Sequence, residues 1–119
     1  MNLYEILLPV TNNDGERMHL AHGRLQDFLL ETIGGYTECP NVEGAWRNDT
    51  GLVMYDKSVP YRVTCHSEDW RKIVARAFEL WPDQQAIFHT KLGEATIEER
   101  PLLSVPMDHA AYKEQFYYD

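Results

Sequence analysis

Hydrophobic and polar positions recur with two different periods along the chain. Residues 3–10 form a short apolar run of strand-forming side chains, which predicts a buried strand. From about residue 17 to residue 33 the apolar positions recur every three or four residues, as they do on one face of a helix. The pair Gly34 and Gly35 predicts the end of that helix, because glycine readily adopts the left-handed capping conformation.

The second half of the chain repeats this order of patterns. Residues 36–48 and 52–66 indicate two extended segments, each interrupted once, the latter at Lys57 and Ser58. Ser67 is the predicted N-cap of a second helix, which Pro82 ends. Residues 85–99 predict a last strand, bent at Gly93. The two helical stripes place four large side chains in the core: Phe28, Leu29, Trp70 and Phe78.

The order strand, helix, strand, strand, helix, strand predicts a ferredoxin-like α+β fold. Its βαββαβ arrangement gives a four-stranded antiparallel sheet with both helices on one face, since the crossovers are right-handed. We expect residues 1–99 to form one domain. Residues 100–119 form a C-terminal tail that packs either on the domain or on a partner. The tail is rich in residues that suit an interface: Leu102, Leu103, Tyr112, Phe116, Tyr117 and Tyr118.

Strand alternation divides the sheet into a helix-covered side and an open face. Tyr4, Ile6, Leu8, Val59, Tyr61, Val63 and Cys65 share the more apolar side, which we expect to lie under the helices. The predicted open face carries the other parity: Glu5, Leu7, Arg62, Thr64, His66, Ile87, His89 and Lys91. Within this set, Glu5, Leu7, Arg62, His66, Ile87 and His89 are the candidate binding residues.

The chemistry of this face supports three interpretations. A carboxylate, two imidazoles and a guanidinium could perform acid–base catalysis, with Glu5, His66 and His89 moving protons and Arg62 holding an anion. The mixture of apolar and charged side chains also suits a protein interface. The sequence alone favours a solvated sheet face with cross-strand charge pairs over a catalytic site.

A second candidate site lies around a predicted hairpin. Asn48–Gly51 has the composition of a turn, with Gly51 suited to positive φ. Trp46, Arg47 and Tyr61, with Lys57, offer stacking and anion contacts. Alternation does not put them all on one face, so a structural role is favoured, with Trp46 in the core and Arg47 facing Asp56 at the strand ends.

Composition narrows the classes of function. The chain has 119 residues, is 44% hydrophobic and carries a net charge of −8, which predicts a small acidic soluble protein and argues against nucleic-acid binding. No apolar run is long enough for a membrane span, and no signal peptide is evident, so we expect a cytoplasmic protein with Cys39 and Cys65 as reduced thiols. His19 and His22 have a helical spacing used by metal sites, but no third ligand is evident. No cofactor motif is present, and neither a metal nor a cofactor is expected.

Two stretches, "EGAWRNDTGLVMYDKSVPYRV" and "QQAIFHTKLGEATI", resemble a loosely defined group of small bacterial and phage proteins with a Gly-x-Trp-Arg-like hairpin. The resemblance covers residues 3–99 and implies the ferredoxin-like fold without an established activity or catalytic residues. The predicted function is therefore an interaction protein, either a phage-type inhibitor of a host protein or a self-associating dimer. The alternative is the small acid–base enzyme.

Overall fold

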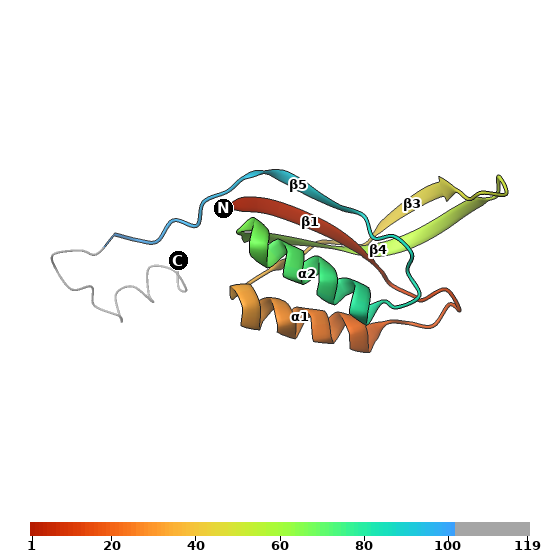
Figure 1. Cartoon of the computed structure of the whole chain (residues 1–119), viewed down its shortest axis with the longest axis horizontal. Coiled ribbons are helices and arrows are strands. Elements are labelled where there is room, and N and C mark those ends of the chain that lie inside the picture. The colour runs from red at the N-terminus through yellow and green to blue at the C-terminus, as the bar shows by residue number, and fades with distance from the viewer. Residues whose placement is uncertain (102–119) are drawn as a thin grey trace, which may run out of the picture.

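The computed structural model describes residues 1–101, and the predicted tail lies almost entirely outside this range. Two helices and five strands follow one another along the chain (Figure 1). In order they are β1 (Asn2–Pro9), α1 (His19–Ile33), β2 (Thr37–Glu38), β3 (Val42–Arg47), β4 (Val53–Cys65), α2 (Ser67–Leu80) and β5 (His89–Glu94).

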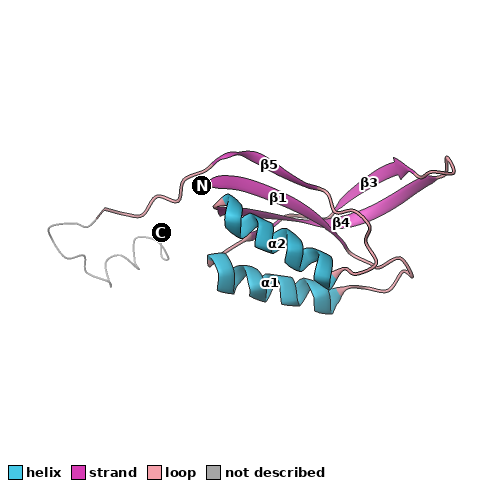
Figure 2. Cartoon of the chain, viewed as in Figure 1, coloured by secondary structure: helices cyan, strands magenta, loops and turns pink. Residues whose placement is uncertain are grey.

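The fold is the predicted ferredoxin-like α+β arrangement. The antiparallel sheet has the order β2-β4-β1-β5, and both helices lie on one of its faces (Figure 2). The sheet has five strands rather than four, because the predicted second strand is split into β2 and β3, which pair with successive parts of β4. Pro40 lies between them, and proline cannot donate a ladder hydrogen bond.

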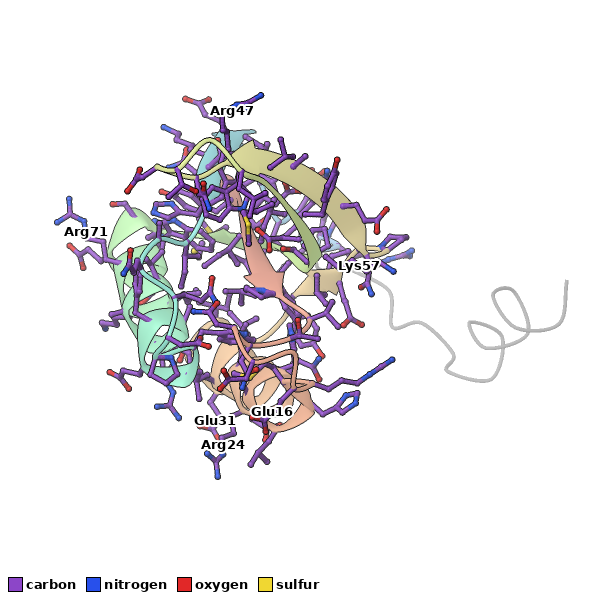
Figure 3. All side chains as sticks on the ribbon, turned by 90° about the vertical axis from the view of Figure 1, so that its right-hand side faces the viewer. Glu16, Arg24, Glu31, Arg47, Lys57 and Arg71 are labelled. Atoms are coloured by element: carbon purple, nitrogen blue, oxygen red, sulfur yellow. The ribbon has the colours of Figure 1, made fainter. Side chains whose placement is uncertain are left out.

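The core lies between the sheet and the helices, as the alternation predicts. Ile6, Leu8 and Tyr61 are at most 1% exposed on the sheet side, and Leu25, Ile73 and Trp81 are as fully buried on the helix side. Charged side chains such as Arg24, Glu31 and Arg71 point outward (Figure 3). Because the core and the helices cover one face of the sheet, the opposite face is the one available for contacts with other molecules.

One of the four predicted core side chains is misplaced. Leu29 and Trp70 are buried and Phe28 packs against the core, but Phe78 is 40% exposed. Phe78 follows Ala77, which is fully buried. The helix therefore turns the position after Ala77 toward solvent, at the edge of the apolar stripe.

Three local predictions in the second half of the chain also need correction. β4 runs without a break through Lys57 and Ser58, because Ser58 pairs with both Pro9 and Val42. Helix α2 begins at Ser67, with His66 rather than Ser67 as its N-cap. β5 starts only at His89, so the first part of the predicted last strand is irregular.

Two other local predictions hold. Gly34 caps α1 at a φ of 84°, and its N–H lies 3.2 Å from the carbonyl oxygen of Leu29. The register between β1 and β5 shifts at Leu3 and Tyr4, opposite Gly93 and Lys91, which is the irregularity expected near Gly93. No helix among residues 1–101 is long and apolar enough to cross a membrane.

The β3–β4 hairpin extends beyond the body of the sheet (Figure 1). We call residues 42–57 the arm. Every residue of β3 is exposed, and β4 is exposed from Val53 to Lys57 before it enters the core at Val59. The predicted turn joins the two strands, with the Gly51 N–H donating to the Asn48 carbonyl over 3.0 Å and Gly51 at a φ of 84°.

Candidate functional site

A row of polar side chains crosses the open face, the side of the sheet that no described helix covers. Backbone register places Thr37, Arg62, Glu5 and Thr90 side by side on four neighbouring strands. The Arg62 Nε donates to the Glu5 carboxylate over 2.8 Å, and this contact raises the pKa of the Arg62 guanidinium. The side chains of Arg62 and Glu5 are 48% and 17% exposed. The charge of Arg62 is therefore already balanced within the sheet.

An apolar row lies next to this polar row. Pro60 is opposite Leu7, and the Leu7 N–H donates to the Phe88 carbonyl oxygen over 3.0 Å. Leu7 is half-buried, whereas Phe88 is 63% exposed. The open face thus combines an internally paired ion pair with an exposed aromatic side chain.

The structure reverses the predicted orientation of the last strand. His89 is paired with Ile6 and Lys91 with Tyr4, so both belong to the helix-covered side, and Ile87 packs against the core. The Trp70 Nε1 donates to His89 Nδ1 over 3.3 Å. Ile87 and Phe88 are adjacent and both apolar, so alternation by itself gives no preference for either face. Only pairing with β1 decides between them.

The candidate acid–base residues do not converge. Glu5 is on the open face, His89 is on the helix-covered side, and His66 follows the end of β4 as the exposed N-cap of α2. Proton transfer between such groups requires them to lie within hydrogen-bond reach of one substrate. This geometry does not assemble the three residues into one catalytic site.

The second candidate site is also dispersed. Tyr61 is fully buried beneath the helices, whereas Trp46 is 53% exposed on the arm and is not a core residue. Arg47 pairs with Val53 rather than facing Asp56, and its Nη1 donates to the Gly51 carbonyl over 2.9 Å at the arm tip (Figure 3). Trp46 alone of the three contributes to an accessible apolar surface.

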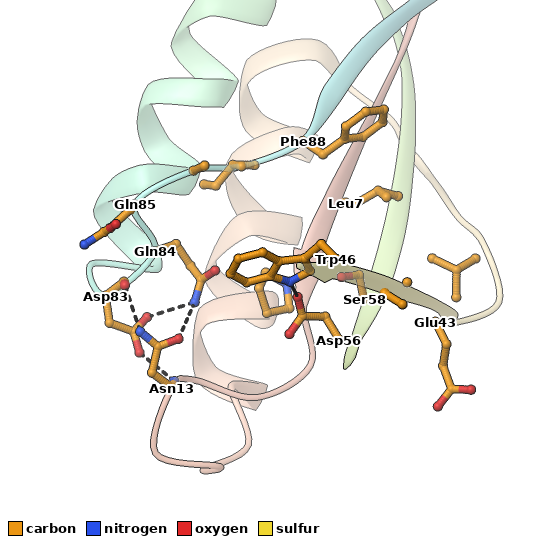
Figure 4. Close-up of a pocket in the computed structure, with 16 residues that line it drawn as sticks. Leu7, Asn13, Glu43, Trp46, Asp56, Ser58, Asp83, Gln84, Gln85 and Phe88 are labelled. Carbon is orange, nitrogen blue, oxygen red and sulfur yellow. Dashed lines mark hydrogen bonds between the residues drawn. The ribbon is translucent and has the colours of Figure 1, made fainter. Parts of the chain in front are cut away.

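The arm and the irregular segment before β5 enclose a groove of about 860 Å³. Leu7 and Pro9 contribute to its lining from β1, Val42 and Trp46 from the arm, and Phe88 from the segment before β5 (Figure 4). Of the residues that line it, the sequence indicates Leu7, Ile87 and Trp46 as candidates but misses Val42 and Phe88. We call this cavity the groove.

Polar contacts hold the walls of the groove in place. The Trp46 Nε1 donates to the Asp56 carboxylate over 2.5 Å across the arm. At the opposite wall the Asn13 backbone N–H donates to the Asp83 carboxylate over 2.8 Å, and the Gln84 Nε2 donates to Asn13 Oδ1 over 3.1 Å (Figure 4). The groove is therefore apolar with a hydrogen-bonded polar rim, which is the usual composition of a binding site.

A hydrogen-bonded network beneath the helices anchors the end of β1. The His22 Nε2 donates to the Pro9 carbonyl over 2.9 Å, which leaves Nδ1 to accept from the Tyr61 hydroxyl over 2.8 Å. The Trp81 Nε1 also donates to the Pro9 carbonyl, over 3.1 Å. Burial lowers the pKa of His22 and raises the pKa of Tyr61 to about 12. His22 is thus a partly buried residue whose two ring nitrogens are both used in contacts within the fold.

Comparison with known proteins extends the description of the fold. Neither a protein-family model nor a curated protein sequence matches the chain. Among solved structures, a divalent cation tolerance protein (CutA1) from Thermus thermophilus is similar with a TM-score of 0.61 and 16% identity, covering 82% of this chain and 86% of that one. CutA1 from Oryza sativa gives a TM-score of 0.58 at 12% identity and covers 82% of each chain.

A third similar structure is the periplasmic divalent cation tolerance protein CutA from Archaeoglobus fulgidus. Its TM-score is 0.57 at 14% identity, with 85% of this chain and 86% of that chain covered. At such low identity the similarity concerns the backbone arrangement alone. The chain therefore shares the ferredoxin-like fold with these CutA proteins.

Proposed function

We propose that this chain is a non-enzymatic interaction protein that binds another protein chain through the open face and the arm. The observation that carries this proposal is the apolar surface of the arm. Exposed apolar side chains occur along both of its strands and at its tip: Val42, Trp46, Leu52, Val53, Met54 and Tyr55.

The arm has properties that favour contact with a partner. A two-stranded hairpin without a third strand or a helix to pack against is marginally stable in water. Apolar side chains gathered on such a projection are typical of protein-binding surfaces, and aromatic side chains are enriched in interfaces. Contact with another chain would bury Trp46, which is 53% exposed, and stabilise the arm at the same time.

We favour a second copy of this chain as the partner, which gives a self-associating protein such as a homodimer. The second candidate is a basic site on another protein, as in a phage-type inhibitor of a host protein. The acidic rim of the groove favours this second form, because Glu43, Asp56 and Asp83 contribute carboxylates to the lining, and the lining contains neither Lys nor Arg among the described residues.

Other functions have less support. The separation of Glu5 from His89 argues against the small acid–base enzyme. The names of the similar structures refer to divalent cation tolerance, but residues 1–101 contain no group of three or more His, Cys, Asp or Glu side chains that could hold a metal ion. We therefore do not extend a cation-related role to this chain. A cytoplasmic location is part of the proposal.

Sedimentation velocity over a concentration series tests self-association. We expect the full chain to form a species heavier than a monomer, and Trp46→Ser to weaken that association. The matched control is Leu20→Ser, because Leu20 is also an exposed apolar residue, at 67%, but lies on helix α1. Circular dichroism would verify that both variants remain folded.

Ionic strength separates the two candidate partners. Self-association of a chain with a net charge of −8 should strengthen as salt screens the repulsion between copies. Binding to a basic partner should instead weaken as salt is added. Pull-down from a host extract at increasing salt measures this effect. A chain that stays monomeric at all concentrations, and whose captured proteins do not change with Trp46→Ser, would contradict the proposal.

A further inference from the structure

We infer that the groove binds the aromatic segment at residues 112–118 of a second copy of this chain. This inference rests on the proposed function and names the part of the partner that enters the groove. Residues 102–119 lie outside the described structure, so the occupant is a segment of the chain that the described domain does not use.

The shape and lining of the groove suit an aromatic peptide. Its volume of about 860 Å³ is at the upper end of the roughly 300–1,000 Å³ typical of ligand pockets, so it accommodates several large side chains. Trp46 and Phe88 offer aromatic surfaces that are 53% and 63% exposed. Aromatic pairs contribute attraction beyond the apolar area that they bury.

The segment at 112–118 has the matching chemistry. Its sequence, YKEQFYY, contains Tyr112, Phe116, Tyr117 and Tyr118 within seven residues. Tyr and Phe are enriched in the buried centres of interfaces, where a Tyr hydroxyl can also bond a polar rim. Lys113 is the only Lys or Arg between residues 102 and 119, and Glu114 beside it leaves the segment without net charge, so its aromatic side chains carry the match to the groove.

The path of the chain favours the groove of another copy. The groove lies beside Leu7 and Phe88, but β5 then runs back along β1 until the Ala95 N–H donates to the Met1 carbonyl over 3.1 Å. Residues 96–101 continue away from the arm (Figure 1). The return to the same groove covers roughly 20 Å of strand plus up to roughly 20 Å of this extended segment.

A return of that length would use most of the chain that remains. Residues 102–116 span at most about 50 Å when fully extended. Phe116 would thus reach its own groove only with the intervening chain nearly straight, which carries a large loss of conformational entropy. A neighbouring copy that presents its groove near residue 101 removes this requirement.

Photo-cross-linking in the full chain tests the inference directly. Phe116 is replaced by the photoreactive p-benzoylphenylalanine, and equal amounts of 14N-labelled and 15N-labelled protein are mixed and irradiated. We expect cross-linked peptides that join position 116 to the stretches containing Trp46 or Phe88. About half of them should contain one peptide of each isotope, because contacts between copies combine the labels at random.

Sedimentation of point variants provides the second measurement. Phe116→Ser and Phe88→Ser should each weaken association by at least about tenfold, the effect of an interface anchor residue. Leu20→Ser on helix α1 should leave association unchanged, since Leu20 does not line the groove.

Each contrary outcome identifies what fails. Cross-links confined to one isotope would assign the segment to its own groove and overturn the role of the second copy. Cross-links to other surfaces, or unchanged association of Phe116→Ser, would overturn the inference. If Trp46→Ser still weakened association in that case, the proposed function would stand without it. A chain that stays monomeric at all concentrations would overturn the inference, and the proposed function would fail with it if Trp46→Ser also left the captured proteins unchanged.

Discussion

The His22 imidazole accepts a hydrogen bond from the Tyr61 hydroxyl over 2.8 Å, while its other nitrogen donates to the Pro9 carbonyl. The contact joins helix α1 to strand β4 in the layer between the helices and the sheet. It requires a neutral ring, because a protonated imidazole has no acceptor nitrogen. The network thereby makes the stability of the fold depend on pH.

We predict that the free energy of unfolding falls as the pH is lowered through about 6.5, the ordinary pKa of histidine. Burial lowers the pKa of His22 in the folded chain, and the nearby Glu38 opposes this shift. The unfolded chain then binds the proton more readily than the folded one, so stability is retained above the unfolded pKa and lost below it. Urea denaturation between pH 5 and pH 8 measures the dependence.

A pair of variants assigns this dependence to His22. His22→Gln should reduce the loss of stability between pH 6.5 and pH 5. His19→Gln should leave most of it in place, because His19 is exposed at the start of the same helix and its charge lowers the pKa of His22 less than burial does. Equal pH dependence in all three proteins would contradict the assignment.

Helix α2 offers a matched test of burial. Ile73 is fully buried and Phe78 is 40% exposed on the same helix. Ile73→Ala should reduce the free energy of unfolding by about 2–5 kcal/mol, because it removes buried methyl groups and leaves a cavity. Phe78→Ala should cost clearly less despite the larger side chain. Urea denaturation compares the two, and a greater loss for Phe78→Ala would show that the helix is oriented differently.

The Glu5–Arg62 pair predicts a charge-reversal effect. Arg62→Glu places two carboxylates opposite each other on β1 and β4, and like charges in this position destabilise a sheet. We expect a lower melting temperature for Arg62→Glu and a recovery of most of the loss in the double variant with Glu5→Arg. Additive losses in the double variant would mean that the two side chains do not interact in solution.

The arm tip provides a test of backbone conformation. Within the described structure, a Cβ added at Gly51 or at Gly44 meets nothing within 4 Å, but only Gly51 has a positive φ, of 84°. Gly51→Ala should therefore cost about 1 kcal/mol through left-handed strain, whereas Gly44→Ala should stay within about 0.5 kcal/mol. Thermal unfolding distinguishes them, and equal losses would argue against the turn conformation.

The sequence by itself determined the helices, the order of the elements and the core parity of β1 and β4. Leu25 and Leu29 recur at helical spacing, and Tyr61 and Val63 alternate on a strand, so burial of one face follows from local periodicity. The turn at Gly51 and the cap at Gly34 are equally local, since each depends on the freedom of glycine at positive φ.

Tertiary structure alone decided the face of β5 and the location of the groove. Ile87 and Phe88 are adjacent apolar residues, and only the pairing of Glu5 with Thr90 directs Phe88 to the open face and the exposed His89 to the helix-covered side. Trp46 and Phe88 are distant in sequence and line one groove because β4 extends past the sheet. The physical reason is that strand pairing is a non-local contact, and a shift of one residue exchanges the two faces of a strand.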